Sequence, residues 1–196
     1  MDNEKKIILA IAVYAAIMVM VFHSIAVDAQ SFDPANVNAI AINEKGSHIS
    51  LVAEEVADFL IKSADARMMN AQVGLLAIEK GTNSVIRDFG LRIMKDHSLL
   101  LEKIKKLASQ RDIYLPDQLS TKKVGDHRNL SKENGRDFDK TFIKMIIVDH
   151  ERDLKLFKSA AQCNDPEVSA FAKRYLPLIQ SDLEKIKKIK LTLLDE

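Results

Sequence analysis

Apolar residues recur at three- and four-residue steps through four long segments of the chain, beginning near residue 50. This spacing gathers side chains on one face of an α-helix. It predicts four helices, over about residues 50–80, 84–111, 136–162 and 166–189. No strand is predicted, because no alternating run of β-branched residues lasts more than a few positions. The pattern therefore indicates an all-α domain.

The stripe of the first segment consists of apolar side chains alone. We expect its inner face to contain Val52, Val56, Phe59, Leu60, Ala64, Met68, Ala71, Leu75 and Ile78. Gly81 ends this segment, since glycine relieves the strain of a left-handed residue at a helix C-terminus. The last segment begins with Asp165 as N-cap and Pro166 at the first helical position. Pro177 lies inside the last segment and predicts a kink or a lost backbone hydrogen bond.

The lengths of the links between these helices constrain the topology. About three residues join the first helix to the second, and even fewer join the third to the fourth, so each pair forms an antiparallel hairpin. The link over residues 112–135 is long enough to cross from one end of the bundle to the other. Such a crossover predicts a ferritin-like four-helix bundle, with an up-down bundle and a decorated loop as the alternative.

The first 29 residues carry a second kind of signal. Residues 7–27 are apolar except for Tyr14, His23 and Ser24, and two lysines precede them. We expect this hydrophobic helix to be either a signal peptide cleaved after Ala29 or an uncleaved membrane anchor. Both alternatives export the chain, to the periplasm or to the outer side of a membrane. Residues 30–49 then form a linker and residues 50–196 the bundle domain.

Composition narrows the classes of function. A formal net charge of +1 gives no reason to expect nucleic-acid binding, because phosphate contacts need a concentrated excess of lysine and arginine. One cysteine, Cys163, excludes an internal disulfide. No glycine-rich phosphate loop or Gly-x-Ser-x-Gly motif is present, which favours a non-enzymatic role. The sequence leaves the oligomeric state open, a homo-oligomer included, and identifies no protein partner.

Two Asp-His pairs, Asp96-His97 and Asp149-His150, occupy the middle of the second and third helices. Aligning the helices on these pairs aligns their apolar residues as well, for example Phe89 with Phe142, each eight residues before its histidine. The shared offsets describe a single helix face. We therefore expect both imidazoles to point into the bundle at a similar height.

Two inward-facing imidazoles suit a transition metal such as iron, zinc or copper. The neighbouring Asp96 and Asp149 lie about 100° around each helix, where they supply oxygen ligands, hold a neighbouring histidine in one tautomer, or face water. In the alternative, the histidines form a structural or pH-responsive pair with hydrogen-bond partners on neighbouring helices. A carboxylate-bridged di-iron site is not expected, because the sequence has no Glu-x-x-His. Ring nitrogens much more than about 5 Å apart would exclude a shared ion.

Several short motifs recur in a fixed order over about residues 59–188. They are Gly74-Leu75-Leu76-Ala77, Phe89 with Asp96-His97, Phe138-Asp139, Met145 with Asp149-His150, Asp165-Pro166-Glu167-Val168 with Phe171-Ala172, and Leu176-Pro177. In this order and spacing they resemble the bacterial family known as domain of unknown function 4142, described as predicted periplasmic or outer-membrane proteins with a ferritin-like fold. The resemblance implies the crossover topology and supplies no activity.

The same resemblance extends the candidate metal site. Family members typically have a glutamate two residues before the first-helix glycine, where this chain has Gln72, and a histidine six residues after the last-helix proline. Asp182, five residues after Pro177, falls near that histidine position. Together with the two Asp-His pairs, the resemblance implies a metal group of Asp96, His97, Asp149, His150 and Asp182, whereas the loss of the family's glutamate and histidine favours a structural bundle without a metal.

The sequence therefore supports more than one function. The leading hypothesis is an exported, non-enzymatic binding or structural module of the cell envelope. The second is a periplasmic metal-binding protein that uses the inward Asp-His pairs. A third uses the lysines of the last helix, Lys185, Lys187, Lys188 and Lys190, to bind an anionic partner or membrane.

Overall fold

The computed structural model describes residues 44–194, and this part of the chain is entirely helical. Its helices are α2 (Glu44–Lys80), α3 (Ser84–Ser109), α4 (Thr121–Lys132), α5 (Gly135–Ala160) and α6 (Pro166–Leu194). The all-α prediction is confirmed. No helix within residues 44–194 is both long and apolar enough to cross a membrane. The predicted signal peptide or anchor, with its hydrophobic helix, lies outside the described residues.

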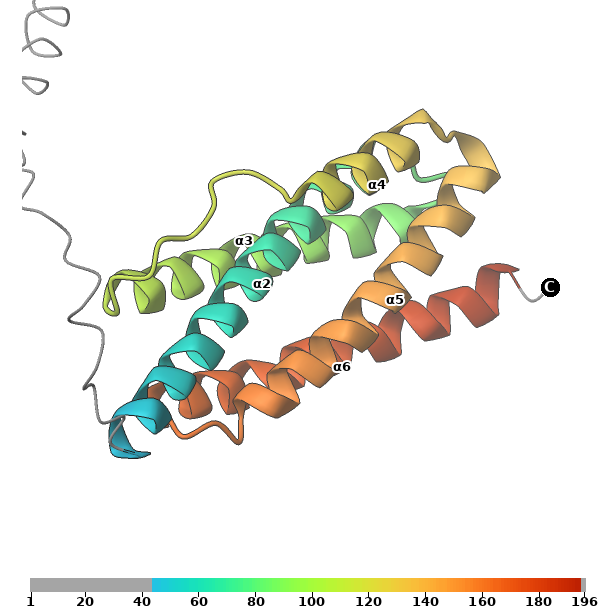
Figure 1. Cartoon of the computed structure of the whole chain (residues 1–196). Helices are drawn as coiled ribbons and strands as arrows, with labels where there is room; N and C mark the ends of the chain where they lie inside the picture. Colours follow the sequence, from blue (N-terminus) through green and yellow to red (C-terminus); the bar gives the residue numbers. More distant parts are fainter. Residues whose placement is uncertain (1–43, 195–196) are drawn as a thin grey trace, which may run out of the picture. The chain divides into compact units, whose positions relative to one another are not determined.

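The four long helices pair as the link lengths predicted. α2 and α3 form one antiparallel hairpin, and α5 and α6 form another (Figure 1). The chain between α3 and α5 runs back along the bundle, so these two helices point the same way (Figure 1). This is the ferritin-like crossover. The up-down alternative is therefore wrong, because it would make α3 and α5 antiparallel.

Two details of the predicted boundaries need correction. The first long helix begins at Glu44, so the last residues of the predicted linker, 44–49, are helical. Extending an existing helix through Gly46 costs only about 1 kcal/mol, far less than starting a new one. The crossover contains α4, which the sequence did not predict. Its apolar signal is weak, because Leu130 is its one fully buried apolar side chain and Val124 is 39% exposed.

The core consists of two apolar clusters at different heights of the bundle. The first surrounds Phe59 and Phe157, whose rings meet edge to face with centroids 5.2 Å apart. The second surrounds Phe89 and Phe142. Between the two clusters every long helix contributes buried polar side chains. These side chains, which we call the polar layer, are Ser63, Arg67, Asn70, His97, His150, Asp153 and Asp182.

The inner face of α2 differs from the predicted apolar stripe. Leu75, predicted to be inside, is 47% exposed. From Leu60 the inner face continues at three- and four-residue steps through Ser63, Arg67, Asn70 and Gly74. Residues next to these, such as Ala71 and Leu75, were predicted to face inward because the interior was expected to be apolar throughout.

The helix ends follow the sequence signals. The Asp165 Oδ1 accepts hydrogen bonds from the backbone N–H groups of Glu167 at 3.0 Å and Val168 at 2.8 Å, so it caps α6 as predicted. Gly81 follows the end of α2, but the predicted reason is wrong. Its backbone is not left-handed; instead, an added Cβ would lie 2.6 Å from the carbonyl oxygen of Ala77.

α2 and α3 approach each other backbone to backbone at two glycines. A Cβ on Gly90 would lie 2.7 Å from the Gly74 carbonyl oxygen, and a Cβ on Gly74 would lie 2.9 Å from the Met94 backbone nitrogen. Backbone atoms cannot rotate away, so both positions require glycine. This contact lies about one turn from Asn70 and two turns from His97, and it fixes how closely these two side chains meet.

We expect Gly90→Ala to lower the free energy of unfolding by about 1–3 kcal/mol, because the added methyl group must push α2 and α3 apart. Urea unfolding followed by circular dichroism measures the change. Gly125→Ala is the matched control: it lies in α4, and a Cβ there meets nothing within 4 Å. That substitution should be neutral or stabilise by up to about 1 kcal/mol. Equal stability of Gly90→Ala and wild type would refute the close contact.

Candidate metal centre

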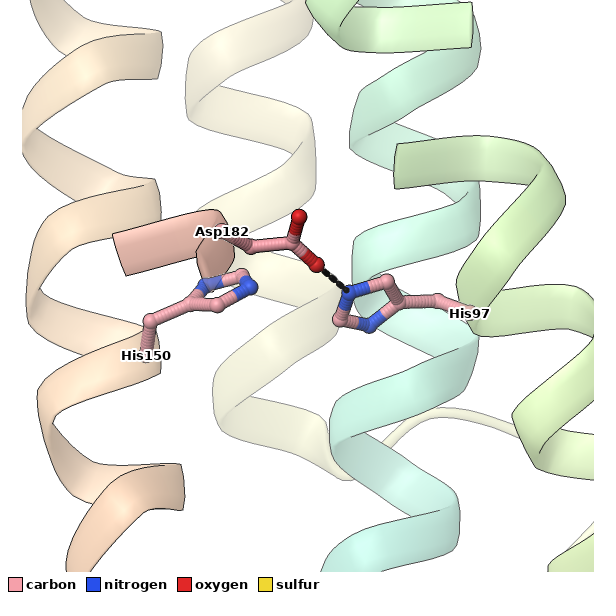
Figure 2. A group of neighbouring side chains, drawn as sticks. All are labelled: His97, His150 and Asp182. Atoms are coloured by element: carbon pink, nitrogen blue, oxygen red, sulfur yellow. Dashed lines mark hydrogen bonds and ion pairs between the residues drawn. The ribbon is translucent and has the colours of Figure 1, made fainter. Parts of the chain in front are cut away.

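Three side chains of the polar layer converge at the middle of the bundle. His97 on α3, His150 on α5 and Asp182 on α6 are all 0% exposed, and one possible ligand atom from each lies within 4.8 Å of the others. The two imidazole centroids are 5.2 Å apart. Figure 2 shows both rings and the carboxylate turned toward one another. The expectation that both imidazoles face inward at one height is confirmed.

His97 is held by hydrogen bonds at both ring nitrogens. Its Nδ1 lies 3.1 Å from the amide nitrogen of Asn70, and its Nε2 lies 3.3 Å from Asp182 Oδ2. The Asn70 carbonyl oxygen is buried without a hydrogen-bond partner among the described residues. Turning the amide over would let that oxygen accept a hydrogen bond from Nδ1–H. His97 would then present a bare Nε2 toward Asp182.

His150 already presents such a bare nitrogen. Its Nδ1–H donates a hydrogen bond to the backbone carbonyl of Ile146 at 3.0 Å, which fixes the tautomer. The opposite nitrogen, Nε2, carries the lone pair and has no hydrogen-bond partner within the described part of the chain. Figure 2 shows this ring directed at the space beside Asp182. An unsatisfied buried acceptor of this kind costs about 1–3 kcal/mol, so it calls for a ligand or another explanation.

Both imidazoles are neutral at physiological pH. Burial lowers the pKa of His150 to about 3, and repulsion from His97 in its protonated form and from the Arg67 guanidinium acts in the same direction. Burial also holds the pKa of His97 well below its ordinary value, with Arg67 and Arg92 adding to the effect. Neutral imidazole is the form that binds metal ions, because protonation occupies the lone pair.

Two arginines surround the group. Arg67 on α2 is fully buried and pairs with Asp153 on α5. Burial lowers the pKa of Arg67 to about 9, against the opposing charges of Asp182 and Asp149. Arg92 on α3 is one-third exposed and reaches Asp182 Oδ1 with its Nη2 at 2.9 Å. The carboxylate of Asp182 thus contacts an imidazole on one oxygen and a guanidinium on the other.

Of the five predicted ligands, the structure brings three together and leaves two outside. Asp96 lies toward solvent, with one oxygen 3.7 Å from the Arg92 Nε. Asp149 pairs with Arg152 at 2.6 Å. Each aspartate precedes an inward histidine, and neighbouring residues point about 100° apart on a helix, so neither reaches the group. The correction removes Asp96 and Asp149 from the candidate ligands.

The sequence interpretation missed the other members of the polar layer. Extending the inner face of α2 from Leu60 in strict three- and four-residue steps would have found Ser63, Arg67 and Asn70. Asp153 lies three residues after His150 and is found by the same rule. Gln72, where the family typically has a glutamate, is exposed and faces away from the group.

The donor set is two nitrogens and one oxygen from three different helices. Imidazole and carboxylate together suit Fe(II), Zn(II), Cu(II) and Ni(II). Ligand atoms of one such ion lie about 3–4 Å apart, so binding must draw the widest pair together by about 1 Å. Side-chain rotation supplies a movement of that size. Only one carboxylate belongs to the group, which leaves a single-ion site as the fitting arrangement.

Fold and site together define a ferritin-like helical bundle with a buried His-His-Asp group. The chain belongs to the family described as domain of unknown function, DUF4142, whose pattern it matches over residues 45–189. The resemblance inferred from the short motifs is therefore confirmed.

A solved structure has the same fold. It is the crystal structure of a DUF305 fragment from Deinococcus radiodurans, with a TM-score of 0.62 and 10% sequence identity. The likeness covers 69% of this chain and 94% of that fragment. At this level of identity the likeness concerns the fold alone. A search of curated proteins finds no match.

The neutral histidines predict how stability depends on pH in metal-free protein. The unfolded chain protonates both imidazoles as the pH falls through about 6.5, whereas the folded state does not until far lower, so acid favours unfolding. Between pH 7 and 5.5 we expect the free energy of unfolding to fall, with a slope that approaches about 1.4 kcal/mol per pH unit for each imidazole.

Urea unfolding in the presence of a chelator measures that slope. His150→Leu should reduce it by about half, because one of the two buried imidazoles is gone. His127→Leu, which removes a histidine of α4 outside the group, should leave it unchanged. A flat stability profile for wild type over this range would contradict the burial of neutral imidazoles.

Proposed function

We propose that this protein binds one divalent transition-metal ion between His97, His150 and Asp182. One observation carries the proposal. The Nε2 of His150 is buried and has no hydrogen-bond partner among the described residues, and His150, His97 and Asp182 each offer a ligand atom within 4.8 Å of the others. A bound ion would satisfy that nitrogen and bridge three helices. The preset tautomer of His150 supports the same conclusion, since no proton has to leave Nε2 first.

A second candidate function rests on a different observation. His97 and Asp182 already have hydrogen-bond partners without any ion, and Arg92 neutralises the carboxylate. These contacts support a metal-free structural module, in which the polar layer specifies how the helices pack. The two candidates differ in one measurable quantity, the stoichiometry of bound metal.

Binding, rather than catalysis, is the role that we propose for the group. A groove of about 560 Å³ is lined by apolar residues with Arg111 and Asp165 at its edge, and no ligand of the group lines it. The buried ligands lie between the two apolar clusters of the core. A substrate would have to part the helices to reach them.

We further propose that the chain is exported and that the bundle acts outside the cytoplasm. The support is the apolar run over residues 7–27 behind two lysines. Expression of the full chain in a bacterium, followed by fractionation and intact mass measurement, tests it. We expect periplasmic protein that has lost residues 1–29, or membrane-bound protein of full mass. Full-length protein in the cytosolic fraction would contradict export.

Metal loading tests the main proposal. After removal of metal and dialysis against Zn(II), Fe(II) or Cu(II), wild type should retain about one equivalent of at least one ion by elemental analysis. His97→Ala with His150→Ala should retain almost none, and Asp182→Asn should bind at least tenfold more weakly.

Two matched controls lie outside the group. His127→Ala removes a histidine and Asp149→Asn removes a carboxylate, and both should keep wild-type stoichiometry. Circular dichroism confirms that each variant is folded. If folded wild type retains no stoichiometric metal under any of the three conditions, the metal-binding proposal is wrong and the structural module stands.

A further inference from the structure

Arg92 contacts the same carboxylate, Asp182, that a bound cation would need as a ligand. Its Nε donates a hydrogen bond to Asp182 Oδ1 at 3.0 Å, and its Nη2 lies 2.9 Å from the same oxygen. The other carboxylate oxygen of Asp182 faces His97. Each carboxylate oxygen of Asp182 therefore already contacts a ring or guanidinium nitrogen. A divalent ion beside this carboxylate would also be repelled by the guanidinium.

A second carboxylate lies ready to receive Arg92. Asp96 is one turn further along α3, and its Oδ2 is 3.7 Å from the Arg92 Nε. Arg92 and Asp96 side chains are each 34% exposed, whereas Asp182 is fully buried. A small rotation of the long arginine side chain is enough to exchange the buried partner for the exposed one.

Arg92 lines a groove of about 440 Å³ between α3 and α6, together with Val85, Phe89, Lys185 and Ile189. The side chain thus lies between this open groove and the buried carboxylate.

We infer that Arg92 is a displaceable counter-ion, which neutralises Asp182 in the metal-free protein and moves to Asp96 when a divalent ion binds. The inference rests on the proposed function. It explains why an ion pair reaches into the group, and it gives Asp96 a role beside the metal site. It also makes the site selective by charge, because a monovalent ion offers Asp182 no more charge than the guanidinium that it replaces.

Removing the charge of Arg92 tests this inference. Zn(II) affinity is measured by competition with a chromophoric chelator, and the association rate by stopped flow. We expect Arg92→Gln to bind Zn(II) about tenfold more tightly and faster than wild type, since no cation has to be displaced. Arg92→Lys, which keeps the charge, should stay near wild type. Lys95→Gln removes an exposed charge from the same helix and should change affinity by less than about twofold.

Asp96→Asn provides a second, independent variant. Loss of the receiving carboxylate should weaken Zn(II) binding about threefold in the wild-type background and have no effect when combined with Arg92→Gln. In wild-type protein the Arg92 Nε–H resonance should shift on addition of Zn(II), as this group changes its carboxylate partner. Thermal unfolding of the metal-free variants shows that all are folded.

The outcomes separate this inference from the proposed function. Equal or weaker Zn(II) binding by Arg92→Gln, with wild type still binding one equivalent, overturns the role of Arg92 and leaves the metal site intact. An effect of Asp96→Asn that persists in the Arg92→Gln background also overturns it. No Zn(II) binding by either wild type or Arg92→Gln overturns both proposals together.

Discussion

The buried polar layer determines how this bundle is assembled. Arg67, Asp153 and Asp182 are charged groups with almost no contact with water, and the effective penalty for burying each ion is several kcal/mol unless a partner is in place. The partners come from different helices, so the penalty is offset only when α2, α3, α5 and α6 are in the correct register. The apolar clusters on either side supply the driving force for folding, and the layer between them selects one alignment among the many that apolar stripes alone would allow.

Much of the fold could be predicted from the sequence because it depends on local rules. Helical periodicity, the Asp165 cap and the short hairpin links act within a few residues, and the shared offsets around His97 and His150 placed both imidazoles on inner faces. The polar layer could not be predicted in the same way. Arg67 is acceptable in the core only because Asp153, 86 residues away, pairs with it, and no local pattern contains that information. Asp96 and Asp149 were misplaced because adjacency in sequence does not mean adjacency on a helix face.

The His-His-Asp group is held close to electrical neutrality by its surroundings. Two imidazoles with low pKa values and one carboxylate form a compact group of low net charge, and the arginines beside it hold the local charge close to neutral. The departure at Gln72 does not affect this group, since the residue of α2 that reaches His97 is Asn70. A difference from the family pattern therefore affects this group only where the residue lies on the inward face of its helix.

The contact between Gly74 and Gly90 has a consequence for the internal motions of the bundle. This close contact resists sliding of the two helices, because a shift by one turn, about 5.4 Å, would replace a glycine at the contact with a residue that carries a Cβ, and there is no room for one. The α2–α3 hairpin should therefore move as one rigid unit. Internal motion of the bundle is then concentrated at the interface between the two hairpins, where packed side chains can change rotamer. The His-His-Asp group lies across this interface.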